Sequence, residues 1–127
     1  MATYSKIPYK RVSFKQLENA VKWCQNNLNL RDWKIELEIG NTAPGWIIDD
    51  GRIGSSQTYV PYFTAKVWVC PKRCKENDTH PISVLCHEML HVFFYNYGIE
   101  DHDERATNTL EYHLFQNWLN KNKKRKN

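Results

Sequence analysis

Two histidines and a glutamate stand in a spacing that suits zinc chemistry. Residues 86–91 read CHEMLH, which contains the pattern His-Glu-x-x-His. Residues four apart in an α-helix lie about one turn apart, so the imidazoles of His87 and His91 can meet one Zn²⁺. Glu88 is then placed to accept a proton from a water on that ion. The motif predicts a zinc hydrolase with His87 and His91 as metal ligands and Glu88 as the general base.

The segment around the motif is expected to be a helix. A cap-rich cluster over 77–80 precedes Pro81, which suits a first turn, and Gly98 suits a left-handed C-terminal cap. About sixteen residues of helix fit between them. The polar trio shares one side of this helix. The apolar residues of the opposite arc are Ile82, Leu85, Cys86, Met89, Val92 and Phe93.

This arc is expected to bury itself in the core and so to hold the trio rigidly. The alternative is an ordinary amphipathic helix whose histidines and glutamate are merely solvated.

The other elements follow from hydrophobic period and turn signals. Ser13 and Gln16 match a capping box at the start of the first helix. In chain order, the sequence predicts a helix over 14–29, a strand over 33–39, one or two short strands within 45–60 with a hairpin tip at Asp50-Gly51, a strand over 62–69, the motif helix, and a helix over 103–120.

The strand over 62–69 lies between Pro61 and Pro71, which suggests the edge of a sheet. The expected fold class is α+β. A small, mostly antiparallel sheet would pack on the N-terminal helix and the motif helix, with a C-terminal helix after them.

Length and composition favour a single domain. The chain has 127 residues, of which 41% are hydrophobic, so we expect one domain over 1–120 and a basic tail over 121–127. The formal charge of +4 comes largely from that tail. Such a tail is usually a solvated end and less often a contact to nucleic acid. No signal peptide or membrane span is recognisable, so we expect a cytoplasmic protein without membrane contacts.

The four cysteines are then expected to be reduced thiols. Cys24 and Cys86 are expected to be small buried apolar residues. An alternative is a structural zinc site that joins Cys70 and Cys74 to Cys86, but the spacing is loose.

A catalytic zinc needs a third protein ligand. Glu104, Asn108, Glu111 and Phe115 share one face of the last expected helix. If the two helices run antiparallel, Glu111 is level with the motif, whereas Glu104 alternatively closes a capping box. The sequence by itself leaves both open. The full set of candidates after the motif is Glu100, Asp101, His102, Asp103, Glu104 and Glu111.

The order of elements, the motif, Gly98 and the segment 104–108 (ERATN) resemble the small gluzincin-type zinc peptidases common in phages and their cellular relatives. The resemblance covers most of residues 13–119. It implies a zincin-like fold, a Zn²⁺ cofactor, a peptide or protein substrate and endopeptidase activity; a phage-encoded member would act in the host cytoplasm. It also implies Glu104 as the third ligand, supported by Asn108. The interval of 13 residues from His91 to Glu104 is shorter than the interval usual in larger gluzincins.

The expected reaction is hydrolysis of a peptide bond. Zinc would lower the pKa of a water toward about 7, and Glu88 would take its proton and pass it to the leaving amine. An extended peptide could pair with the expected edge strand over 62–69.

Two other functions compete with this interpretation. A SprT-like DNA-associated protease would use the basic tail, and its usual third histidine could only be His102. A catalytically inactive zinc-binding interaction module is the other alternative.

Overall fold

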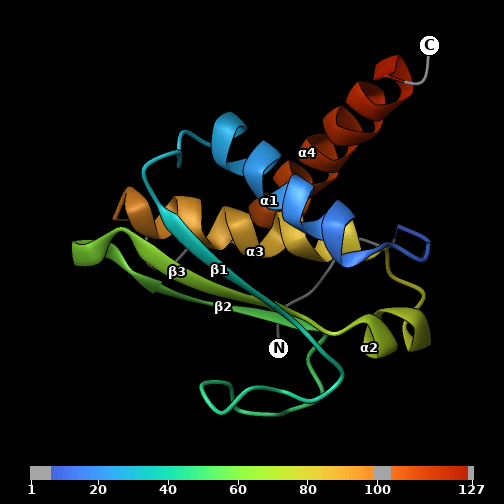
Figure 1. The fold of residues 1–127 in the computed structure, drawn as a ribbon, viewed down its shortest axis with the longest axis horizontal. Coiled ribbons are helices and arrows are strands. Elements are labelled where there is room, and N and C mark those ends of the chain that lie inside the picture. The colour runs from blue at the N-terminus through green and yellow to red at the C-terminus, as the bar shows by residue number, and fades with distance from the viewer. Residues whose placement is uncertain (1–6, 99–103, 126–127) are drawn as a thin grey trace.

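The computed structural model describes residues 7–98 and 104–125, and within the last helix the side chains of residues 106–121 (Figure 1). It confirms the α+β class. The elements are α1 (Phe14–Asn27), β1 (Lys34–Ile39), β2 (Gly54–Tyr59), a 3-10 turn (Val60–Tyr62), β3 (Thr64–Val69), α2 (Pro71–Glu76), α3 (Pro81–Asn96) and α4 (Glu104–Arg125).

The sheet has three strands in the order β1-β3-β2. β3 pairs in parallel with β1 and antiparallel with β2. The sheet is therefore mixed, and the expectation of a mostly antiparallel sheet is wrong. The expected edge strand over 62–69 is also wrong, because β3 is the central strand. Pro61 and Pro71 lie just outside Thr64–Val69, so neither proline removes a hydrogen-bond donor from the strand ladder.

The two faces of the sheet are covered differently. Residues on one face join the hydrophobic core under α3; they include Ile35, Leu37, Ala65 and Val67. Figure 1 shows α3 between the sheet on one side and α1 with α4 on the other. This arrangement makes α3 the central helix of the described fold.

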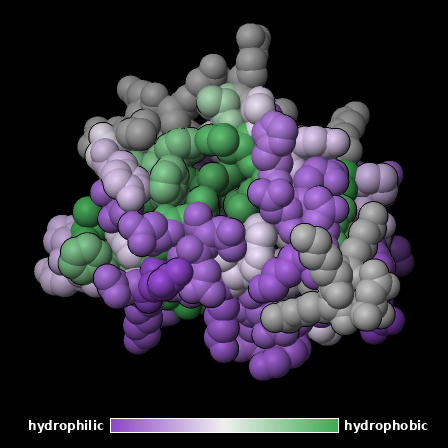
Figure 2. All heavy atoms as spheres, turned by 90° about the horizontal axis from the view of Figure 1, so that it is seen from above, coloured by the Kyte–Doolittle hydropathy of each residue, from purple (hydrophilic) through white to green (hydrophobic). Residues whose placement is uncertain are grey.

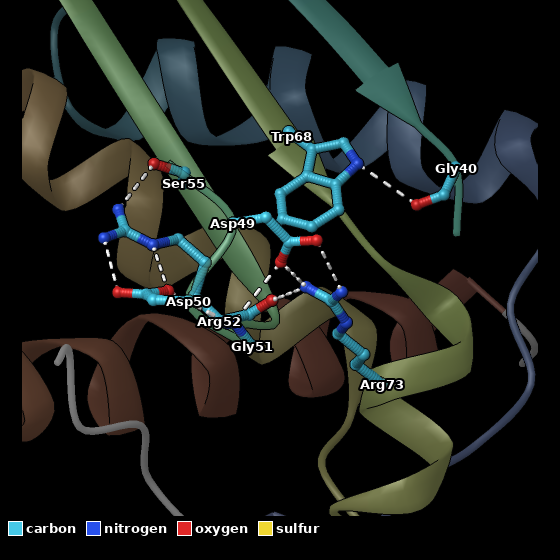
Figure 3. Close-up of polar contacts among 8 residues, drawn as sticks. All are labelled: Gly40, Asp49, Asp50, Gly51, Arg52, Ser55, Trp68 and Arg73. Carbon is cyan, nitrogen blue, oxygen red and sulfur yellow. Dashed lines mark hydrogen bonds and ion pairs between the residues drawn. The ribbon is translucent and has the colours of Figure 1, made fainter. Parts of the chain in front are cut away.

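The opposite face is partly exposed, and the segment 40–53 contacts it at the Trp68 end. Trp68 lies on this face and is only 1% exposed. Its indole N–H donates to the carbonyl of Gly40 at 3.1 Å, and the Arg73 guanidinium lies over the ring at 5.9 Å (Figure 3). The tryptophan therefore ties the end of β1 to the start of α2.

The expected hairpin tip at Asp50-Gly51 is wrong, since residues 41–53 form turns and bends without a strand. Ion pairs hold the segment instead. Arg73 pairs with Asp49 at 2.8 Å and donates to the carbonyl of Arg52 at 3.0 Å (Figure 3). Hydrogen bonds from Arg73 and Arg52 lower the pKa values of Asp49 and Asp50 respectively.

The helices match the sequence with two differences. The capping box of Ser13 and Gln16 is confirmed at the start of α1. The short helix α2 was not expected, although Pro71 stands in its first turn. α4 continues to Arg125, beyond its expected end at residue 120, and its far end projects from the body of the fold (Figure 1). In the part of the chain that the structure describes, no helix is long and apolar enough to cross a membrane.

The space-filling view in Figure 2 shows apolar side chains gathered on one part of the surface, with polar side chains around them. The large apolar residues with exposed side chains include Ile48, Tyr62, Phe63 and Tyr97. Exposed apolar residues are common on protein surfaces, so these residues assign no function by themselves.

Candidate active site

The motif helix has the bounds that the sequence predicts. α3 spans 16 residues from Pro81 to Asn96, and Gly98 follows it with φ +72°. The cap is His80, whose Nδ1 accepts the backbone N–H of Ile82 at 3.1 Å. Burial of the ring, and then the charge of Lys10, lower the pKa of His80 to about 4, so the imidazole is neutral and able to accept this hydrogen bond at neutral pH.

The first ten residues of α3, Pro81 to Leu90, are buried on every side of the helix rather than on one face alone. His87 is fully buried and Glu88 is only 3% exposed, so the polar side of the helix is covered as well as the apolar arc. His87 and Glu88 are therefore not solvated, as the alternative required, whereas His91 is half-buried. Buried ionisable side chains are costly unless partners or an ion compensate them. The burial therefore points to a built site.

The two motif histidines lie against each other. Their ring centres are 4.7 Å apart, with an angle of 70° between the ring planes. Two imidazoles that bind one tetrahedral zinc through their Nε2 atoms place their ring centres about 5 Å apart. His91 is half-buried, so the pair reaches from the interior to the accessible side of α3. The ring separation fits a shared ion.

A hydrogen bond from α4 fixes the ring of His87. Its Nδ1 lies 2.9 Å from Oε1 of Glu111, and both side chains are fully buried. An ionised carboxylate can only accept a hydrogen bond, so opposite an ionised Glu111 the Nδ1 atom donates, and in a neutral imidazole Nε2 then carries the lone pair. That is the tautomer in which Nε2 serves as a metal ligand.

The acidic side chains near the histidine pair also suit a cation. Glu88 and Glu111 are two buried carboxylates beside the histidine pair. No described residue donates a hydrogen bond to Oε2 of Glu111. A divalent ion held by the histidine pair would be stabilised by carboxylates nearby in a region of low dielectric constant.

The third expected ligand lies where side chains are not described. Glu104 is the first residue of α4, and its side chain is outside the described residues, as are Glu100, Asp101, His102 and Asp103. Glu104 precedes Glu111 by seven residues, about two helical turns, so both positions fall on the same face of α4. Among the described side chains, no three His, Cys, Asp or Glu residues form a metal-binding group.

The alternative site of three cysteines does not form among these residues. Cys86 packs against Cys24 of α1, with the sulfur atoms 4.0 Å apart. The hydrogen bond to Cys24 and the complete burial raise the pKa of Cys86. Both residues are buried, as the sequence predicts, and all four cysteines are free. These thiols are packing residues of the core.

The partner of His87 was not predicted from the sequence. Glu111 was expected level with the motif, which is correct, but only as a possible metal ligand. The sequence contained a signal for this contact, because Glu111 shares a helix face with Asn108 and Phe115. Phe115 packs edge-on against His80, with ring centres 4.8 Å apart, so this face of α4 does lie along α3.

No protein-family model, curated protein or solved structure matches this chain. The resemblance to gluzincin-type peptidases therefore stays a prediction. The geometry of α3 and α4 is the basis for assigning a function.

Proposed function

We propose that this protein is a zincin-like, zinc-dependent metallopeptidase. The observation that carries the proposal is the arrangement on α3. The ring centres of His87 and His91 lie 4.7 Å apart, and Nδ1 of His87 is hydrogen-bonded to the buried carboxylate of Glu111. A helix that served only for packing has no need of buried histidines and glutamates in this order. The motif spacing and the ring contacts support the same chemistry.

His87, His91 and Glu104 are the residues that would hold the ion. Glu111 is the less suitable third ligand, because its Oε1 is engaged with Nδ1 of His87. The two nitrogens of an imidazole point in divergent directions. A carboxylate bound to Nδ1 therefore lies on the far side of the ring from an ion on Nε2. The position of Glu104, about two turns earlier on the same face of α4, suits a ligand better.

Zinc, when bound, supplies a Lewis acid that activates water and polarises a carbonyl group. Glu88 acts as the general base: its carboxylate accepts a proton from the attacking water and passes it to the leaving amine. The side chain is 3% exposed and sits beside His87 in a region of low dielectric constant.

The substrate pairs with β2 in this proposal. β3 has partners on both sides, so the peptide cannot add to it as the sequence suggested. Among the described strands, β2 is at an edge of the sheet, and it packs against α3. The residues of β2 that face α3 are small: Gly54, Ser56 and Thr58 pair with the core residues Val69, Val67 and Ala65. Small side chains let α3 approach this edge closely, so an extended peptide added to β2 would run beside the motif.

Two measurements on the full chain test the function. Elemental analysis should find one zinc per chain, and the zinc-loaded protein should cleave a casein-derived peptide mixture. Glu88→Gln keeps the size of the side chain, so it should retain the zinc and lose about 10²–10⁴-fold in rate. The exposed Glu76 offers a control, because Glu76→Gln makes the same chemical change away from the site. Full activity in Glu88→Gln would exclude the mechanism, and a wild-type chain that binds no zinc would exclude the function.

A further inference from the structure

We infer that Glu111 is a positioning residue that orients His87 for zinc. The inference deepens the proposed function and rests on it. The hydrogen bond between Oε1 of Glu111 and Nδ1 of His87 sets which ring nitrogen faces the ion and how the ring is turned. The resemblance to gluzincin-type peptidases assigns the supporting role to Asn108. The geometry points to the glutamate about one turn later.

The contact has the character of a strong hydrogen bond. The 2.9 Å separation lies in the range of charge-assisted bonds, and neither side chain is exposed to water. In a region of low dielectric constant such a bond is stronger than the same bond at a surface. It raises the electron density on the opposite nitrogen and so strengthens the bond from that nitrogen to a metal.

Glu111 is itself held in place by α4. Thr107, one turn before it, is fully buried, and Phe115, one turn after it, is 1% exposed and packs against His80. Farther along, Trp118 of α4 packs edge-on against Trp23 of α1, with ring centres 5.7 Å apart. α4 therefore packs against the start of α3 and against α1. This packing leaves the Glu111 carboxylate little freedom to move away from His87.

A purely structural role does not account for this glutamate. Thr107 and Phe115, one turn before and one turn after it, are buried without burying a charge. A buried charged residue is commonly no better for stability than an apolar residue of the same size. Glu111 carries a desolvation cost that an apolar residue at this position would avoid. A role in orienting His87 would explain why a charged residue stands at this position despite its cost in stability.

The test compares the same substitution at two positions of α4. Zinc affinity is measured by competition with a chromophoric chelator for the wild type, Glu111→Gln, Glu104→Gln and the surface control Glu76→Gln. Glu111→Gln should bind zinc about 10–100-fold more weakly, as for other residues that support a ligand. Glu104→Gln should weaken binding much more, and Glu76→Gln should not change it. Unfolding by urea in the presence of chelator shows for each variant whether the metal-free fold is intact.

Cobalt substitution separates a supporting residue from a ligand. In Glu111→Gln the visible spectrum of bound Co²⁺ should keep the shape and intensity of the wild-type spectrum, because the ligands are the same. Unchanged zinc affinity in this variant would overturn the inference. A changed cobalt spectrum would also overturn it, because Glu111 would then be a ligand. A wild-type chain that binds no zinc would instead remove the proposed function, and the inference with it.

A second measurement needs no variant. The ¹⁵N chemical shifts of the His87 ring in the zinc-loaded wild-type protein report which nitrogen carries the proton. We expect a protonated Nδ1 and a zinc-bound Nε2. Coordination through Nδ1 would overturn the inference even if Glu111→Gln failed to fold.

Discussion

The outer edge of β2 provides a sharp test of how the substrate binds. The backbone N–H of Cys70 donates to the carbonyl of Ile53 at 2.9 Å, so these two residues form a hydrogen-bonded pair at the start of the ladder. Along an antiparallel ladder such pairs alternate. Ser56 therefore directs its backbone N–H and C=O away from β3. Ser56→Pro removes this one outward donor and leaves the pairing of β2 with β3 in place.

The size of the effect follows from the loss of one hydrogen bond. A peptide that adds to β2 would accept a bond from the N–H of Ser56, and such a bond contributes a net ~0.5–1.5 kcal/mol. Its loss from the transition state lowers kcat/KM by about 2- to 13-fold. Zinc affinity should not change, because Ser56 lies on β2 and is none of the proposed zinc ligands.

The assay measures kcat/KM on a peptide long enough to span the strand, and Ser56→Ala is the matched control. The alanine variant removes the hydroxyl group but keeps the backbone donor, so its kcat/KM should match that of the wild type. Equal rates for Ser56→Pro and Ser56→Ala would refute substrate pairing at β2. A loss of zinc or of the urea unfolding transition in Ser56→Pro would show that the N–H belongs to the fold instead.

Four further predictions concern stability, pH, thiols and the metal. Leu85→Ala should lower the free energy of unfolding by about 2–5 kcal/mol, measured with urea, because Leu85 is fully buried. His80 has a pKa of about 4 in the folded chain, below its ordinary value of 6.5. Its neutral ring therefore contributes stability that is complete above pH 6.5 and is lost as the pH falls toward 4. His80→Asn keeps a hydrogen-bond acceptor at the cap but has no titrating ring. Over this pH range its free energy of unfolding, measured with urea, should fall by up to about 3 kcal/mol less than that of the wild type. Burial raises the pKa of Cys74 to about 12, and all four cysteines are buried. A thiol reagent at pH 8 should thus label the chain only after unfolding. Finally, a chelator should abolish hydrolysis and leave the far-ultraviolet circular dichroism unchanged, since the described core is built from apolar side chains; unfolding on chelation would instead indicate a structural ion.

Local signals predicted the motif helix well. Pro81 and Gly98 fix its two ends through backbone preferences that depend on only a few neighbouring residues. The capping box at Ser13 is local in the same way. The spacing of His87 and His91 likewise predicted that the rings would meet, because it follows from helix geometry alone.

Long-range pairing was not predictable from the same signals. Whether residues 62–69 form an edge or the centre of the sheet depends on β1, which pairs with β3 across about 30 residues of chain. Prolines at the ends of a strand report on those ends and not on its neighbours. The burial of the polar side of α3 at His87 and Glu88 was also missed, although Val84 stands on that side of the helix and is fully buried. A valine on that side is a signal of a second packing partner, and α4 does pack against α3.

The parallel pairing of β1 with β3 also bears on the order in which the sheet assembles. Tyr59 and Thr64 are close in sequence, so the β2–β3 hairpin closes a short loop, whereas pairing of Lys34 with Thr64 must close a much longer one. Loop-closure entropy favours the hairpin as the earlier structure, with β1 docking onto it later. By the same reasoning β1 is the first strand to detach in transient openings of the native state. Amide hydrogens along β1 should then exchange with deuterium sooner than those that join β2 to β3.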